Sequence, residues 1–252
     1  MESVGGFVTR TTCDDARVTP VTSSSAPEVL VVWGRGSASG GPDHLLRLAV
    51  AAHLGVDPGA VQTGRLCPRC ASSDHGRTVV LRAGDVTPRG ERRPVHVSLS
   101  RAAGRTVVAV TTAGPVGVDV EHVDAAGFDT FARVGLHRDE ADGDATWRTR
   151  TWVRKESLVK ATGDGLMVDL RDVQVTAPDR APGLVRWDGR DAPVGGVEMV
   201  DLEVPEQPGQ PTFIASLTLL RSDGDAQMLP TVVTTRQADD LTDLRAPAAL
   251  SP

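Results

Sequence analysis

Tyrosine is absent from this sequence of 252 residues, and phenylalanine and tryptophan contribute only four residues each. A core of stacked aromatic rings is therefore excluded, and valine, leucine and alanine must supply the buried apolar surface. The chain also lacks an excess of basic residues: its formal charge of −6 argues against a protein that mainly binds the phosphate backbone of nucleic acids. A local basic patch is still compatible with this charge, since net charge does not describe how charges are distributed.

Signals for export and membrane insertion are lacking too. The first residues, MESVGGFVTRTTCDDARVTP, contain neither the basic segment nor the apolar run of a secretory signal. No apolar run approaches the roughly 20 residues needed to cross a bilayer. The three cysteines are an odd number, which argues against a disulfide framework. We therefore expect a cytoplasmic monomer that binds neither membrane nor nucleic acid.

Composition and periodicity divide the chain into four parts. Residues 1–27 are rich in short polar side chains without sustained periodicity, and residues 221–252 are similar, so we expect both to be disordered. Between them, residues 28–112 and 113–220 each contain a long helical pattern and several strand patterns. Because helices and strands do not alternate regularly, the pattern predicts an α+β fold rather than a doubly wound sheet.

Caps and apolar spacing predict two long helices, one from Asp43 to Gly55 and one from Ala145 to Ala161. A shorter helical segment lies at 128–136. The predicted strands are residues 28–33, 78–81, 95–100, 106–110, 116–121, 172–177, 197–204 and 213–220.

The predicted strand VGVDVE, residues 116–121, carries two acids among valines. Alternation directs its three valines toward a core and places Gly117, Asp119 and Glu121 on the opposite face. The two carboxylates then lie about 6.6 Å apart along the strand, close enough to repel each other. The simplest interpretation is an antiparallel strand with one solvated face.

The second helix contains the stretch WVRKESLVKATGDGL, residues 152–166. Glu156 and Lys160 are four residues apart and share one helix face. Taken alone, they are most simply a surface pair that stabilises the helix by about 0.2–0.5 kcal/mol. Together with the strand acids they form a plausible site for a hard cation, with a lysine beside it. Mg²⁺ prefers oxygen ligands and shares its shell with substrate phosphates, and such an ion would relieve the repulsion between Asp119 and Glu121.

These two stretches, about thirty residues apart, resemble the surfactin-type 4'-phosphopantetheinyl transferases. That family has an Ile/Val-Gly-Ile/Val-Asp-x-Glu strand and a Trp-x-x-Lys-Glu-Ser/Ala-x-x-Lys helix. The stretch VHVSLSRAAGRTVVAV is similar to the family's third motif, and CPRCASSDHGRTVV to a cysteine-rich segment of its actinobacterial members. The resemblance extends from about Asp43 to Leu220.

The resemblance implies two similar α+β subdomains related by a pseudo-twofold axis, residues 28–112 and 113–220, with coenzyme A in the cleft between them. It implies a holo-[acyl-carrier-protein] synthase type of enzyme. The phosphopantetheine arm of coenzyme A would move to a serine of a carrier protein of fatty acid, polyketide or nonribosomal peptide synthesis. By position, the Mg²⁺ ligands are Asp119, Glu121 and Glu156; the catalytic residues are Glu156, as a base, and Lys160; and the coenzyme A contacts are Arg77, Ser100, Arg101 and Lys155.

The sequence departs from the family pattern in three places. The family's Ser-His-Ser reads Ser100-Arg101-Ala102, and Arg101 keeps a positive charge in place of the histidine. The N-terminal half is short, with GRGSASGG where the family has tens of residues, so that Arg35 is the basic residue at hand. The segment HGRT lacks the usual proline. These departures favour one alternative, a degenerate member that binds a partner without transferring the arm, which coenzyme A binding would distinguish.

Two further groups of residues have both a functional and a structural interpretation. Cys67 and Cys70 have the spacing of zinc ligands, and His75 lies nearby, but a second pair is missing and only Cys13 or Asp74 could complete four ligands. Buried or redox-neutral thiols are the simpler interpretation; a zinc-stabilised interaction module is a further alternative. The apolar residues Phe128, Phe131, Val134 and Leu136 could contact a carrier protein, although core packing is the simpler role, as it is for His122.

Overall fold

The computed structural model describes residues 8–11, 26–35, 41–67, 70–83, 94–191, 193, 196–206, 209, 211–221 and 230–241. It mixes helices and strands in a way that is compatible with the predicted α+β class. Most of the segments that we expected to be disordered, 1–27 and 221–252, lie outside the described residues, as does Cys13. None of the described helices is long and apolar enough to cross a membrane.

The first half of the chain forms a sheet with one long helix on it. Strands β2 (Glu28–Arg35), β6 (Arg105–Thr111) and β5 (His96–Ala102) are antiparallel neighbours in the order β2-β6-β5. Helix α1 (Gly41–Leu54) packs on this sheet through its buried apolar residues Leu45, Leu46, Ala49 and Val50. The 3₁₀ turn η1 (Pro58–Ala60) leads to a two-stranded hairpin of β3 (Val61–Leu66) and β4 (Arg77–Ala83).

The second half of the chain forms a second sheet with its own helix. Strands β7 (Val116–His122), β11 (Phe213–Leu220) and β10 (Val197–Leu202) are antiparallel neighbours in the order β7-β11-β10. Helix α3 (Ala145–Thr162) begins after Asp144, whose side chain accepts the Trp147 N–H, and ends at Gly163 with φ +81°. The other elements are α2 (Phe131–Gly135), η2 (Gly165–Met167), η3 (Leu170–Asp172), β8 (Val173–Val175) and β9 (Leu184–Trp187).

The two halves repeat one order of elements. The first runs strand, helix, hairpin and two strands, as β2, α1, β3-β4, β5 and β6; the second runs β7, α3, β8-β9, β10 and β11, with α2 inserted before its helix. In each half the first strand pairs with the last, and the last pairs with the one before it. Each half therefore contains one long helix and several strands, as the sequence pattern predicts.

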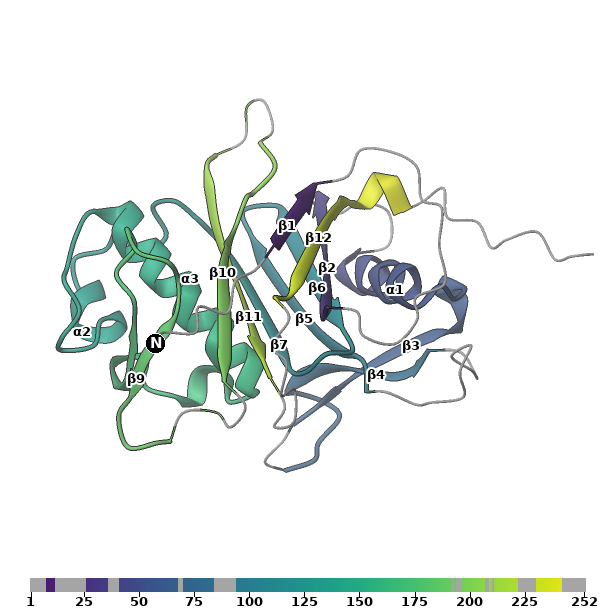
Figure 1. The fold of residues 1–252 in the computed structure, drawn as a ribbon, viewed down its shortest axis with the longest axis horizontal. Coiled ribbons are helices and arrows are strands. Elements are labelled where there is room, and N and C mark those ends of the chain that lie inside the picture. Colours follow the sequence, from purple (N-terminus) through teal and green to yellow (C-terminus); the bar gives the residue numbers. More distant parts are fainter. Residues whose placement is uncertain are drawn as a thin grey trace, which may run out of the picture.

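The two sheets face each other across one apolar core. Valines of β2 and β6 meet Val116, Val118 and Val120 of β7 and the apolar side chains of β11. Separate apolar clusters lie under α1 and under α3. The two helices therefore cover the outer faces of the two sheets, as Figure 1 shows. Valine, leucine and alanine dominate these clusters, as the scarcity of aromatic residues requires.

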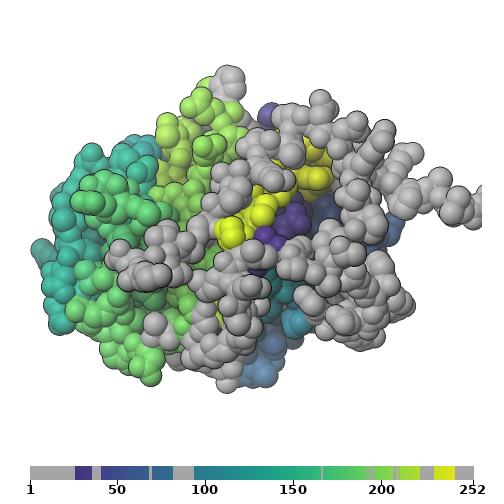
Figure 2. Space-filling model, viewed as in Figure 1, coloured from purple at the N-terminus to yellow at the C-terminus, as the bar shows by residue number. Residues whose placement is uncertain are grey.

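Two segments that we expected to be disordered contain strands. Residues Val8–Thr11 form β1, and Val232–Gln237 form β12, which is followed by the 3₁₀ turn η4 (Ala238–Leu241). Strand β12 lies between β1 and β2, parallel to both, so that the first sheet has the order β1-β12-β2-β6-β5. Figure 2 shows the yellow residues of β12 beside the purple residues of β2. The prediction of disorder is wrong for these residues. Strand β12, near the end of the sequence, pairs with β1 and β2, near its beginning, and this pairing orders both segments.

The second face of β7 is buried rather than solvated. Its valines point to the core, as alternation predicts, but Gly117 and Asp119 lie under α3 and are also buried. A Cβ atom at position 117 would lie 1.9 Å from the carbonyl oxygen of Ser157 and 2.5 Å from the Ala161 nitrogen. Only glycine therefore allows α3 to approach β7 this closely, and this approach brings the helix acid to the strand acids.

Candidate functional site

Three carboxylates gather where α3 crosses β7. Asp119 and Glu121 come from alternate positions of the strand, and Glu156 comes from the helix. Asp119 is 2% exposed and Glu156 is 8% exposed, so neither lies on a solvated surface. The simplest interpretations from the sequence, a solvated strand face and a surface helix pair, are therefore wrong. The three acids lie near enough for the charges of Asp119 and Glu156 to act on Glu121.

Lys160 and Ser100 hold Asp119 in place. The Lys160 Nζ atom donates to Asp119 Oδ1 over 2.5 Å, and the Ser100 hydroxyl donates to the same oxygen over 2.7 Å. Lys160 also donates to Ser100 Oγ over 3.0 Å and to the carbonyl oxygen of Val118 over 3.3 Å. These contacts join α3, β7 and β5 at one point. On the helix, Lys160 lies one turn beyond Glu156, as the spacing of four residues predicts.

The pKa of each of the three carboxyl groups is raised. Burial raises the pKa of Asp119, and the Lys160 ammonium and the hydrogen bonds to Lys160 and Ser100 oppose this effect. Burial and then the charge of Asp119 raise the pKa of Glu156. Burial, the charge of Asp119 and the charge of Glu156 together raise the pKa of Glu121 to about 7. One ammonium group thus compensates only part of the negative charge gathered here.

Two buried oxygen atoms of this cluster are left without hydrogen bonds. Asp119 Oδ2 and Glu156 Oε1 have no hydrogen-bond partner in the described part of the chain. A buried, unpartnered carboxylate oxygen costs free energy unless a cation or a donor satisfies it. Oxygen atoms from three carboxylates are the donor set that Mg²⁺ prefers. The donor chemistry of these residues fits a divalent cation, which would balance the excess charge; because the three carboxylates do not all lie within 4.8 Å of one another, their side chains must move closer together to bind one ion.

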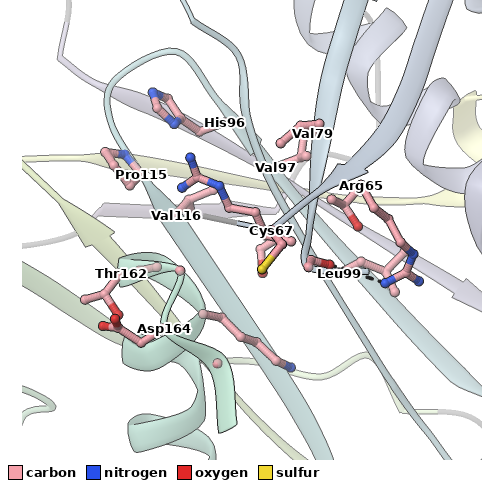
Figure 3. Close-up of a pocket in the computed structure, with 18 of the residues that line it drawn as sticks. Arg65, Cys67, Val79, His96, Val97, Leu99, Pro115, Val116, Thr162 and Asp164 are labelled. Carbon is pink, nitrogen blue, oxygen red and sulfur yellow. Dashed lines mark hydrogen bonds between the residues drawn. The ribbon is translucent and has the colours of Figure 1, made fainter. Parts of the chain in front are cut away.

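A pocket of about 690 Å³ adjoins this cluster. Its walls are the end of β3, the strands β4 and β5, the start of β7, and the last turn of α3 with the residues after it. Figure 3 shows Arg65, Cys67 and His96 on one side of the pocket, with Thr162 and Asp164 across from them at the end of α3. Residues from both halves of the chain therefore enclose one space, and Lys160 belongs to the pocket and to the carboxylate cluster alike.

The charged residues of the pocket are mostly basic. Arg65, Arg77 and Lys160 line it together with His75 and His96, while Asp164 is the acid among the lining residues. Arg77 reaches across to the end of α3, where its Nη1 atom lies 3.3 Å from the position that a Cβ of Gly163 would take. A pocket with three cationic side chains suits a ligand that carries several phosphate groups.

The predicted coenzyme contacts divide into two groups. Arg77 lines the pocket, and Ser100 bonds Asp119 and Lys160. Arg101 is exposed and is not among the residues that line the pocket, because alternation along β5 turns it away from Ser100. The structure thus brings Arg77 and Ser100 to the site but leaves Arg101 outside it.

Lys155 does not reach the pocket. Its side chain is fully buried, and its Nζ atom donates to Glu140 Oε2 over 2.5 Å, to the Gly135 carbonyl over 2.8 Å and to the Leu170 carbonyl over 3.0 Å. Burial lowers the pKa of Lys155, and Glu140 opposes this shift. The prediction that Lys155 contacts a diphosphate does not fit this position, in which all three donors are used within the protein.

We expect replacement of Lys155 by methionine to destabilise the fold and to leave ligand binding unchanged. The substitution leaves Glu140 as a buried charge without its cation, which typically costs about 3–5 kcal/mol. Urea denaturation measures the loss. The exposed Arg180, replaced by glutamine, is the control and should change stability by no more than about 0.5 kcal/mol. A loss in the Lys155 variant as small as in the control would contradict a structural role for the pair.

Sequence patterns missed several residues of this region. Arg65 and His96 line the pocket, but β3 was not predicted because VQTGRL lacks a clear apolar alternation.

Phe131 and Leu136 are buried, as the core interpretation predicts, whereas Phe128 and Val134 are 47% and 50% exposed. The ring of His122 packs edge-on against Phe213, so that residue does pack against a neighbouring side chain.

Comparison with known proteins identifies similarity centred on the second half. Residues 115–197 match the model of the 4'-phosphopantetheinyl transferase superfamily. A 4'-phosphopantetheinyl transferase of Bacillus subtilis is 24% identical over 144 residues, which is 54% of this chain and 57% of that protein. The chain thus spans about half the length of this curated relative. The segment matched by the family model includes Asp119, Glu121, Glu156 and Lys160, while Arg77 and Ser100 lie outside it.

Proposed function

We propose that this protein transfers the 4'-phosphopantetheine arm of coenzyme A to a serine of an acyl or peptidyl carrier protein. The observation that carries the proposal is the carboxylate cluster of Asp119, Glu121 and Glu156, with two unsatisfied buried oxygens, beside a basic pocket. The similarity of residues 115–197 to the superfamily supports the same activity. The surfactin-type subclass and the pseudo-twofold relation of residues 28–112 and 113–220 are part of this proposal; the repeated order of elements supports the latter.

The pocket would hold the phosphates of coenzyme A. Arg65 and Arg77 line it on the side of the first half, and Lys160 on the side of the second. Guanidinium groups bind phosphate oxygens through paired hydrogen bonds, and an ammonium acts as a point charge. Lys160 is therefore placed to stabilise charge that moves to the leaving group, adenosine 3',5'-bisphosphate, as its bond to phosphorus breaks.

Asp119, Glu121 and Glu156 are the residues that would hold Mg²⁺. When bound, the ion would neutralise charge on the diphosphate during phosphoryl transfer. Ser100 and Lys160 orient Asp119 from the other side, so that the ligand carboxylate is fixed before any cation arrives.

Glu156 is the candidate base for the incoming serine. Its Oε1 atom is free of hydrogen bonds within the described residues. A carboxylate that lies within about 2.6–3.2 Å of the serine hydroxyl, or one water away, can accept its proton as the new oxygen–phosphorus bond forms. In the cation-free protein, burial and the charge of Asp119 raise the pKa of Glu156, whereas a bound cation would oppose this shift and keep the carboxylate ionised.

The direct test is the intact mass of an apo carrier protein after incubation with this protein, coenzyme A and Mg²⁺, with and without EDTA. We expect a gain of one phosphopantetheine arm that EDTA prevents. No gain with several unrelated apo carriers, under conditions where a known transferase modifies them all, would contradict the proposal. The cytoplasmic location and the monomeric state expected from the sequence remain predictions.

A second candidate is a degenerate protein that binds a partner without transfer. The exposed position of Arg101, which stands where the family has a histidine, favours it, because this residue does not line the pocket. Calorimetric titration with coenzyme A separates the two candidates. Binding that weakens on replacement of Arg77 by glutamine supports the transferase, whereas undetectable binding supports the degenerate protein.

The carboxylate cluster also predicts how stability depends on pH. The pKa of Glu121 is about 7 in the folded protein and 4.5 ordinarily, so between these values the folded state keeps a proton that the unfolded state has lost. Without divalent cations, the unfolding temperature should therefore fall as pH rises from 4.5 to 7. Mg²⁺ should raise it more at pH 7.5 than at pH 5, because only the ionised carboxylates bind the ion.

Replacement of Glu121 by glutamine provides the control for this prediction. The variant should show a smaller decrease over the same pH range, while Asp119 and Glu156 still contribute a part in the same direction. Differential scanning calorimetry measures both proteins. If the unfolding temperature falls equally with pH in the wild type and the variant, Glu121 does not cause the decrease. A Mg²⁺ effect independent of pH would count against the cluster as a cation site.

A further inference from the structure

Two cysteines and a histidine converge in the connection from β3 to β4. Cys67 follows the last residue of β3, Cys70 lies in the turn after it, and His75 lies two residues before the start of β4. Their ligand atoms all lie within 4.8 Å of one another, and Cys70 Sγ is 3.4 Å from His75 Nε2. Among the described residues, no other three ligand atoms of His, Cys, Asp or Glu lie within 4.8 Å of one another. The three carboxylates of the candidate active site lie farther apart than this.

The backbone of this connection is built to bring the three side chains together. The Cys67 N–H donates to the Ser72 carbonyl, and the Ala71 N–H donates to the Cys67 carbonyl, each over 2.9 Å. Ala71 has φ +54°, a conformation that alanine rarely adopts. Gly76 has φ +102°, and a Cβ there would lie 2.4 Å from the Leu66 carbonyl oxygen. The two ends of the loop are therefore pressed together around the cysteine turn.

Apolar packing does not explain this convergence. None of the residues from Cys67 to Gly76 that the structure describes belongs to an apolar core cluster. Cys70 and His75 are exposed, and Cys67 is half-buried. Of the two alternatives expected from the sequence, buried or redox-neutral thiols, the buried one is therefore wrong for Cys70. A tight, strained loop without an apolar core needs another source of stability, and a bound metal ion supplies it in many small loops.

We propose that Cys67, Cys70 and His75 bind one Zn²⁺ ion. Thiolate and imidazole are the ligands that zinc prefers, in tetrahedral geometry with bonds of about 2.3 and 2.0 Å. At the tetrahedral angle such bonds place ligand atoms about 3.3–3.8 Å apart, so the present separations of at most 4.8 Å need only small side-chain movements. Asp74 does not belong to this set. The described residues therefore supply three ligands, and water can take a fourth position.

The proposed zinc site lies in the wall of the basic pocket. Cys67, His75 and Gly76 line the basic pocket, and Arg77 follows directly at the start of β4. An ion that ties Cys67 to His75 fixes one wall of the pocket and the backbone that carries Arg77. This zinc site is separate from the carboxylate cluster and does not depend on the proposed transferase activity.

Zinc content and the cobalt spectrum of the full-length protein test the proposal. We expect about one zinc per chain after purification without chelators. The Co²⁺-substituted protein should show thiolate charge-transfer bands in the near ultraviolet and the intense visible bands of tetrahedral coordination. Replacement of Cys70 by serine, or of His75 by asparagine, should lower zinc affinity at least about tenfold in a chelator competition, since even indirect partners of a ligand contribute that much.

Replacement of the exposed Ser73 by alanine is the matched control, because it changes the same loop but removes none of the three ligands. It should keep zinc content and affinity unchanged. Circular dichroism shows whether the Cys70 and His75 variants fold, and the cobalt spectrum of the wild type tests the site even if they do not. Less than about 0.1 zinc per reduced chain after incubation with stoichiometric Zn²⁺ would overturn the proposal. So would a loss in the Ser73 variant as large as in the Cys70 variant.

Discussion

The variant Glu156→Gln should keep the fold and lose phosphopantetheine transfer. General-base catalysis contributes about 10²–10⁴-fold in rate, and an amide cannot accept the serine proton. We expect kcat to fall by at least the lower figure, measured as the rate of carrier-protein mass gain at saturating coenzyme A. Full activity in this variant would remove Glu156 from the proposed mechanism.

Stability distinguishes this catalytic role from a structural one. Glu156 is a buried carboxylate whose Oε1 atom finds no hydrogen-bond partner in the described chain, and burial raises its pKa. Removing such a charge should therefore leave the unfolding temperature of the cation-free protein unchanged or raise it. The exposed Glu203, replaced by glutamine, is the matched control and should change neither activity nor stability. A large fall in the unfolding temperature of Glu156→Gln would indicate instead that the carboxylate holds α3 in place.

Replacing Asp119 by alanine should sharply raise the Mg²⁺ concentration that transfer requires. The variant removes a predicted ligand and the oxygen that anchors Lys160 and Ser100. Even an indirect partner of a metal ligand typically contributes about 10–100-fold to affinity. The Mg²⁺ concentration at half-maximal transfer rate should therefore rise at least about tenfold. Transfer rates measured across a Mg²⁺ series give the midpoint. An unchanged midpoint would exclude Asp119 from the metal site.

Lys160 supplies the comparison that separates the two consequences of losing Asp119. The variant Lys160→Met breaks the same ion pair but leaves every carboxylate in place. We expect its rate to fall because charge on the leaving group loses a cation, while its Mg²⁺ midpoint does not rise. If both variants shift the midpoint equally, the effect belongs to the ion pair and not to a ligand at position 119.

Local patterns in the sequence were sufficient to predict several elements and most of the acid cluster. Val116, Val118 and Val120 alternate on β7 and face the core, and α3 begins at Ala145 as predicted. Helix α1 begins two residues before the predicted Asp43, which lies in its first turn. Spacing alone also put Lys160 on the face of Glu156. These features depend on neighbours within a few residues, which the sequence displays directly.

The burial of α3 could not be obtained in this way. Polar residues such as Thr149, Arg154, Lys155 and Ser157 are buried alongside apolar ones, so the helix has no single apolar stripe that shows which face meets the protein. Lys155 is next to Glu156 in the chain but points elsewhere on the helix, where Glu140 accepts a hydrogen bond from its ammonium group. Its position depends on a residue from another segment, and no local pattern contains that information.

The α+β class, the alternation of β7 and the residue types of the candidate site follow from local sequence patterns. Three features emerge only when the chain folds: β12 lies between β1 and β2, Asp119 and Glu156 are buried, and Arg65 and Arg77 share a pocket with Lys160. The difference lies in the sequence separation of the interacting residues. Strand alternation and helix spacing are set by residues close together in the chain, whereas sheet order, burial and pocket walls result from packing between segments far apart in it.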